Sequence, residues 1–138
     1  MIYQIRDNIY LSNAISAALL TTKDPITAVL NVAVEIKNPG LKHVKWIKSA
    51  MVDNIEDALI HTESIVQHLD SLLNNGETVL VHCRHGHSRS PHIIAACLSK
   101  RENTAYQSIY DEIKSICPEI LSYSIGQEIK DKYGYEWE

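Results

Sequence analysis

The sequence predicts an α/β fold, namely a single domain over residues 1–138 with a mostly parallel, five-stranded central sheet flanked by helices. Five short runs, near residues 2–5, 9–11, 28–33, 46–52 and 78–82, have the length and apolar, β-branched character of strands. Segments with helical spacing of apolar residues alternate with and follow these runs, an order typical of a parallel sheet covered by helices. The length of 138 residues and the hydrophobic content of 45% suit one core.

Four helices are expected. The longest spans residues 57–74, where apolar side chains recur at helical spacing before Gly76 ends the helix. A second begins at Pro91, which fits a first helical turn, and continues through an apolar stretch at residues 93–98. Thr104 and Gln107 form a possible capping box for a third helix that carries Ile109. The last helix is expected over residues 121–132.

Composition narrows the possible partners and compartments. The net charge of −4 and the pI near 5.9 give no general attraction to nucleic acid or acidic lipid. No segment approaches the roughly 20 apolar residues of a membrane span, and the N-terminus lacks a signal-peptide pattern. Three cysteines without paired spacing favour a reducing, cytoplasmic location. No cofactor is expected, and the sequence does not indicate an oligomeric state.

The segment HCRHGHSRS, residues 82–90, is the most specific pattern in the chain. It follows the apolar run 78–82 and precedes the helix expected from Pro91, so that Cys83 would leave a strand end and face the N–H groups of a helix N-terminus. That position binds phosphate dianions and stabilises a thiolate for the same electrostatic reason. Cys83 would thus sit under a ring of backbone N–H groups.

The chemistry of the other loop positions suits a cysteine nucleophile that attacks phosphorus. Gly86 permits loop dihedrals closed to other residues. Arg89 offers a planar fork for two phosphoryl oxygens, and Ser90 can donate a hydrogen bond to the sulfur when it leaves. His82 is expected to be buried and to hold the loop rather than to titrate during catalysis.

Two other interpretations of this segment compete with the nucleophile. An isolated Cys83 would ordinarily be a small buried apolar side chain, but the neighbouring glycine, arginine and serine favour the nucleophile. Cys83, His85, His87 and His92 also offer thiolate and imidazole ligands of the kind that zinc prefers. The cluster lacks the paired CxxC or HxxxH spacings of known zinc sites, and no metal site is therefore predicted.

A general acid is expected upstream of the loop. Expulsion of an alkoxide or phenolate needs a proton donor, for which a positioned carboxylic acid is a common choice. Asp53 ends the strand expected at 46–52 and opens a loop, whereas Asp57 stands where a helix cap or first-turn carboxylate belongs. We favour Asp53, which would later act as the base that activates water.

At residues 82–90 the chain resembles the dual-specificity protein phosphatases of the cysteine-based protein tyrosine phosphatase superfamily. The loop matches the family's His-Cys-x-x-Gly-x-Ser-Arg-Ser form at every fixed position, and weaker similarity extends over about residues 2–132. The resemblance implies that Cys83 is the nucleophile, Arg89 the phosphate clamp, Asp53 the general acid and Ser90 an aid to breakdown of the intermediate. It also implies that backbone N–H groups of residues 84–89 bind phosphate, namely those of Arg84, His85, Gly86, His87, Ser88 and Arg89. One departure is Ser12, where the family usually has glycine.

The expected activity is hydrolysis of phosphotyrosine and of phosphoserine or phosphothreonine in phosphorylated proteins. Two alternatives stay open: a phosphatase acting on a phosphoinositide or an RNA 5′-phosphate end, and a phosphopeptide-binding module with weak catalysis. Cys97 is expected in the core. Some relatives form a disulfide with the nucleophile on oxidation, and for Cys83 the possible partners would be Cys97 or Cys117.

Overall fold

The computed structural model describes residues 1–137 and contains a five-stranded sheet in the order β1-β2-β5-β3-β4. The strands are β1 (Ile2–Arg6), β2 (Ile9–Ser12), β3 (Ala28–Ala33), β4 (Lys45–Met51) and β5 (Val79–His82). Only β1 runs antiparallel to its neighbour β2; the pairs β2–β5, β5–β3 and β3–β4 are parallel. The predicted mostly parallel, five-stranded α/β fold is thus confirmed, with every strand within two residues of its expected ends.

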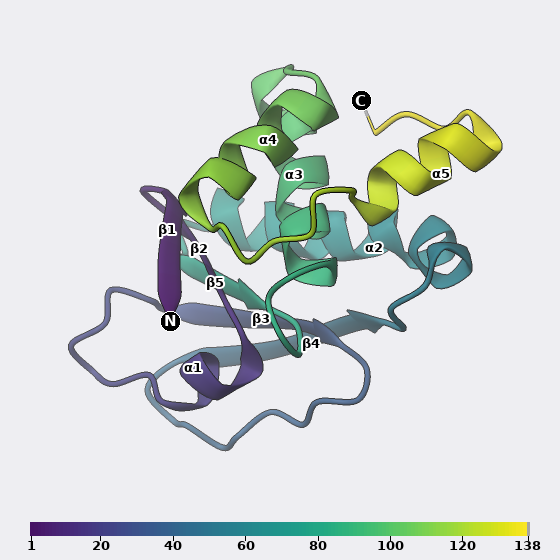
Figure 1. Ribbon diagram of the computed structural model, residues 1–138. Helices are drawn as coiled ribbons and strands as arrows, with labels where there is room; N and C mark the ends of the chain where they lie inside the picture. Colours follow the sequence, from purple (N-terminus) through teal and green to yellow (C-terminus); the bar gives the residue numbers. More distant parts are fainter. Residues whose placement is uncertain (138) are drawn as a thin grey trace.

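The two faces of the sheet are covered unequally (Figure 1). Helices α2 (Ile55–Asn74), α3 (Arg89–Glu102), α4 (Tyr106–Ile116) and α5 (Ile125–Tyr133) lie on one side, where most of the core is found. The short helix α1 (Ala14–Ala18) lies on the other side, over a smaller cluster that includes Val29, Trp46 and Leu80. Alternation of side chains along each strand sends neighbouring residues to opposite faces, and Leu80 and His82 therefore share the face that α1 covers.

The ends of the helices depart from the sequence prediction in ways that local contacts explain. Helix α2 begins at Ile55 because the side chain of Asn54 accepts a hydrogen bond from Asp57 N, which places Asp57 in the first turn. Helix α5 begins four residues later than expected because Ser124 caps it through Gln127 N. Helix α1, capped by Asn13, is absent from the sequence prediction because five residues are too few for a periodic pattern.

The capping box expected at Thr104 and Gln107 is wrong. Helix α3 ends at the left-handed residue Asn103 (φ 50°), and the next N–H, that of Thr104, donates to Ser99 O. The Thr104 hydroxyl donates to Glu102 O, and the Gln107 amide donates to Asp111. Thr104 therefore closes the preceding helix, and α4 begins without a side-chain cap.

Candidate active site

The candidate nucleophile lies at the carboxyl end of the middle strand. All four residues of β5 are buried, and Cys83 follows directly with a relative exposure of 3%. Its Sγ atom lies 3.2 Å from the hydroxyl oxygen of Ser90, in the first turn of α3. This places one hydroxyl where it can donate to the sulfur. Ligands of parallel α/β sheets bind at this edge.

The loop that follows Cys83 is held on both sides by backbone hydrogen bonds. Ala14 N donates to Arg84 O at 3.1 Å, and Leu121 N donates to His87 O at 3.1 Å. These bonds tie the loop to α1 on one side and to the segment before α5 on the other. Its conformation is therefore set by elements from both halves of the chain.

Gly86 is required by both conformation and space. Its φ is +75°, a left-handed value that side chains other than glycine rarely adopt. A Cβ atom at this position would also lie 3.0 Å from Ser12 O. Ser12, where the resembling family usually has glycine, is accommodated because its buried hydroxyl donates to Asn13 O at 2.9 Å.

His82 contacts the loop from beneath and is almost completely buried. Its Nδ1 lies 3.1 Å from Cys83 O and must carry the proton that is donated to this carbonyl oxygen. Burial lowers the pKa of His82 below its ordinary value. These contacts agree with the expectation that His82 is a neutral residue holding the loop.

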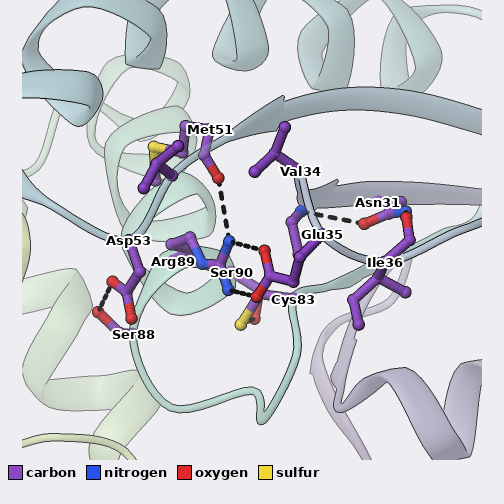
Figure 2. Close-up of polar contacts among 12 residues, drawn as sticks. Asn31, Val34, Glu35, Ile36, Met51, Asp53, Cys83, Ser88, Arg89 and Ser90 are labelled. Carbon is purple, nitrogen blue, oxygen red and sulfur yellow. Dashed lines mark hydrogen bonds and ion pairs between the residues drawn. The ribbon is translucent and has the colours of Figure 1, made fainter.

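Arg89 is held by a carboxylate that the sequence prediction missed (Figure 2). Its Nη1 and Nη2 atoms donate to the two carboxylate oxygens of Glu35 at 2.7 and 2.6 Å, and Nη1 also donates to Met51 O at 3.0 Å. The Arg89 guanidinium lowers the pKa of Glu35 from 4.5 to about 2, and Glu35 in turn raises the pKa of Arg89. Glu35 follows the carboxyl end of β3, a position that could have marked it as a candidate.

These contacts leave one side of the guanidinium free. A guanidinium has five N–H donors in a planar fork, and Glu35 and Met51 together accept from three of them. The donors that remain are Nε–H and one N–H of Nη2, which form a second parallel pair. Nε is buried and has no hydrogen-bond partner among residues 1–137. Two phosphoryl oxygens would satisfy this pair.

Asp53 and the start of α3 face the same pocket. The Ser88 hydroxyl donates to Asp53 Oδ1 at 3.3 Å, and Ser88 therefore does not cap α3 with its side chain (Figure 2). The competing carboxylate, Asp57, instead accepts from Val52 N at 2.6 Å and lies at the start of α2. The pocket has a volume of about 180 Å³ and is lined by Asp53, Cys83, Arg84, His85, His87, Ser88, Arg89 and Leu121.

The histidines weighed as zinc ligands occupy two separate places. His85 and His87 lie on the pocket wall with their rings stacked and their centroids 5.9 Å apart. His92 is buried in α3, where its ring nitrogens lie 3.0 Å from the Thr62 hydroxyl and 2.8 Å from that of Tyr106. Among residues 1–137, no group of three potential ligands is positioned to hold a metal ion.

The remaining cysteines have mainly structural surroundings. Cys97 is fully buried in α3, as expected, and burial raises the pKa of its thiol to about 12. Cys117 donates to Glu119 at 3.2 Å, and burial together with this contact raises its pKa to about 11. All three cysteines are free thiols in this structure.

The chain is similar to known phosphatases in both sequence and structure. It is 28% identical to dual specificity protein phosphatase 12 of Rattus norvegicus over 98% of this chain and 39% of that protein. It is also 28% identical to dual specificity protein phosphatase 18 of Homo sapiens, over 83% of this chain and 63% of that protein. The chain thus spans about two fifths of the first of these relatives and less than two thirds of the second.

Solved structures have the same fold. The crystal structure of human DUSP28 superimposes with a TM-score of 0.77 at 21% identity, covering 87% of this chain and 83% of that one. That of human tyrosine phosphatase-like serine/threonine/tyrosine-interacting protein gives 0.75 at 19% identity, covering 96% and 95%. The sequence model described as the dual specificity phosphatase catalytic domain matches residues 9–127. The chain therefore belongs to the dual specificity phosphatase family, in the protein tyrosine phosphatase superfamily.

Proposed function

We propose that residues 1–138 form a single catalytic domain that hydrolyses phosphotyrosine, and also phosphoserine and phosphothreonine, in proteins. The observation that carries this proposal is the convergence of Cys83, Arg89 and Asp53 on one pocket of about 180 Å³. Membership of the family supports the same chemistry. The substrates are phosphorylated proteins, and the reaction needs no metal or other cofactor.

The first step is transfer of the phosphoryl group to sulfur. The Cys83 thiolate attacks phosphorus, the P–O bond to the leaving group breaks, and Asp53 gives its proton to the departing oxygen. Arg89 binds two of the phosphoryl oxygens through Nε–H and Nη2–H. Glu35 and Met51 O accept from the remaining N–H groups of the guanidinium. The backbone N–H groups of the loop and the start of α3 bind the phosphoryl oxygens.

The second step returns the cysteine. Asp53, now a carboxylate, removes a proton from a water molecule, which attacks the phosphorus of the cysteinyl-phosphate. The S–P bond breaks, and the Ser90 hydroxyl, 3.2 Å from the sulfur, stabilises the thiolate that leaves. Inorganic phosphate then departs. A thiolate of this kind needs a reducing compartment, and the three free cysteines suit a cytoplasmic protein.

Two substitutions with matched controls test the proposal. Cys83→Ser should abolish hydrolysis of aryl phosphates and phosphopeptides, whereas Cys117→Ser should retain it. Asp53→Asn should lower kcat by about 10²- to 10⁴-fold for poor leaving groups and much less for good ones, because a good leaving group needs no proton. Asp57→Asn should show no such dependence on the leaving group. Full activity in Cys83→Ser would refute the assignment of Cys83 as the nucleophile.

The substrate class is tested with the same protein. Rates on phosphotyrosine, phosphothreonine, phosphoinositide and RNA 5′-triphosphate substrates should be compared, with Cys83→Ser as the blank. We expect the phosphopeptides to give the highest kcat/KM. A higher value for the phosphoinositide or the RNA would replace the proposed substrate class, and binding of phosphopeptides without turnover would indicate a binding module.

A further inference from the structure

The side chain of Asp53 is held by one hydrogen bond. Asp53 is exposed, as are its neighbours Val52 and Asn54. The Ser88 hydroxyl donates to Asp53 Oδ1 at 3.3 Å (Figure 2). Within residues 1–137, no other hydrogen bond to this carboxylate is present. An exposed side chain that nothing holds samples several rotamers, so the orientation of Asp53 in the pocket depends on Ser88.

The backbone on both sides of Asp53 is, in contrast, fixed to the start of α2. Val52 N donates to the carboxylate of Asp57 at 2.6 Å, and Asn54 N donates to Val52 O at 2.9 Å. The Asn54 side chain in turn accepts from Asp57 N at 2.8 Å. The loop therefore presents Asp53 at a fixed place, and only the rotation of its side chain is left to be set.

Ser88 occupies a position where a serine hydroxyl usually has another partner. It is the N-cap residue of α3, and such a serine commonly accepts a hydrogen bond from the N–H of the second or third helical residue. The third residue here is Pro91, which has no N–H, and the second is Ser90. The Ser88 side chain makes no cap hydrogen bond. Its hydroxyl is therefore available to Asp53, and it does not occupy the N–H of Ser90 at the phosphate-binding end of α3.

We propose that Ser88 is a positioning residue for Asp53, whose carboxyl group it holds over the pocket by donating to Oδ1. This role rests on the proposed function, in which Asp53 is the general acid. When Asp53 is protonated, the oxygen that accepts from Ser88 is the carbonyl oxygen, so the proton lies on Oδ2. Ser88 thus fixes both the rotation of the carboxyl group and the oxygen that gives the proton to the leaving group.

The same hydrogen bond favours the transfer of the proton. As the P–O bond breaks, the Oδ2–H bond breaks as well, and its electron pair stays on Asp53 as negative charge. Hydrogen bonds to a carboxylate are stronger than those to a neutral group. The contact with Ser88 therefore strengthens during the step, and an interaction that strengthens in the transition state accelerates the reaction.

Loss of the hydroxyl should be most damaging with a poor leaving group. We expect Ser88→Ala to lower kcat for phenyl phosphate about ten-fold more than for 2,4-dinitrophenyl phosphate, whose phenolate departs without a proton. A variant that only weakens phosphate binding would lower both rates alike. Ser88→Thr keeps a hydroxyl and should return the ratio of the two rates to within about two-fold of the wild-type ratio.

A double-mutant cycle shows whether the effect passes through Asp53. In the Asp53→Asn protein the general acid is absent, and adding Ser88→Ala should leave the ratio of the two rates as it is in Asp53→Asn. A role of the Ser88 hydroxyl elsewhere in the pocket would instead change the ratio equally in both backgrounds.

Ser124→Ala is the matched control for a serine at a helix start. Ser124 caps α5, and its hydroxyl accepts from Gln127 N at 2.9 Å. Ser124→Ala should therefore lower the melting temperature and keep the wild-type ratio of rates. Ser88→Ala should show the reverse, because its side chain does not cap α3.

Four outcomes would overturn the role of Ser88. These are an unchanged ratio of rates in Ser88→Ala, no recovery in Ser88→Thr, an equal change of the ratio in the Asp53→Asn background, and a fall in melting temperature as large as that of Ser124→Ala. When Asp53→Asn itself depends on the leaving group, these outcomes concern Ser88 alone. If Asp53→Asn shows no such dependence, or if Cys83→Ser is fully active, the proposed function fails and the role of Ser88 fails with it.

Discussion

Glu35→Gln is expected to lower both the stability of the fold and the ability of Arg89 to bind phosphate. The substitution keeps the size of the side chain but removes the charge that faces Arg89 Nη1 and Nη2 at 2.7 and 2.6 Å. The Arg89 side chain is only 5% exposed and would remain as a buried charge with a poorer partner. Its guanidinium would then lose the contact that leaves Nε–H and Nη2–H free for phosphate.

The expected loss of unfolding free energy follows from the lowered pKa of Glu35. A fall from 4.5 to about 2 would correspond to about 3 kcal/mol of pairing free energy if no solvent screened it. The Glu35 side chain is 36% exposed, so solvent screening reduces this value. We expect Glu35→Gln to lose about 1–2 kcal/mol of unfolding free energy at pH 7. A similar loss of transition-state stabilisation would lower kcat/KM by about ten-fold.

The same pair predicts a pH dependence of stability. Because the folded-state pKa of Glu35 is lowered, its contribution is present above the unfolded pKa of about 4.5 and is lost as the pH falls towards 2. The difference in unfolding free energy between wild type and Glu35→Gln, measured by urea denaturation, should therefore shrink between about pH 5 and pH 2.

A matched ion pair elsewhere provides the control. Glu102 also accepts from an arginine, Arg6, at 2.9 Å, and this contact lowers its pKa. Glu102→Gln should affect stability but leave kcat/KM for an aryl phosphate unchanged. A kcat/KM of Glu35→Gln within two-fold of the wild-type value would refute the assignment of Glu35 as the residue that positions Arg89. An equal loss of kcat/KM in Glu102→Gln would refute it as well.

Three further predictions concern the loop and α3. Gly86→Ala should lower kcat/KM and the melting temperature together, because its φ of +75° and the Cβ clash with Ser12 O both distort the loop; normal kinetics would contradict this reasoning. Ser90→Ala should slow breakdown of the intermediate more than its formation, so stopped-flow assays should show a burst of phenol release followed by slow turnover, and a steady rate without a burst would argue against a role at Cys83. Burial lowers the pKa of His92 to about 3. As the pH falls from about 6.5 to 3, the unfolding free energy should therefore decrease by up to about 1.4 kcal/mol per pH unit, because only the unfolded state binds the proton. His92→Asn should flatten this slope in urea titrations.

The parts of the fold that the sequence predicted are those with strong local patterns. The five apolar runs correspond to the five strands, and the segment with helically spaced leucines and isoleucines between residues 57 and 74 lies in α2. The end of α3 was less predictable because the side chain of Thr104 suited two local structures. Its backbone closes α3 through Ser99, a choice that depends on the left-handed conformation of Asn103.

The candidate site likewise contains residues that a local sequence motif predicts and a residue that it does not predict. Cys83, Gly86, Arg89 and Ser90 are predictable because they lie within nine consecutive residues whose chemistry is shared. Glu35 was missed because 54 residues separate it from Arg89, and only the pairing of β3 beside β5 brings the two together.

Formation of a cysteinyl-phosphate is the central claim, and detection of the phosphorylated residue tests it most directly. An aryl phosphate should be mixed with Ser90→Ala protein, quenched during the burst, digested with trypsin and analysed by mass spectrometry. Cleavage after Arg84 separates Cys83, in the peptide of residues 49–84, from His85 and His87 in the peptide of residues 85–89. We predict one phosphoryl group, on Cys83. Phosphate on a histidine, or no phosphorylated peptide while phenol is released in a burst, would contradict the mechanism.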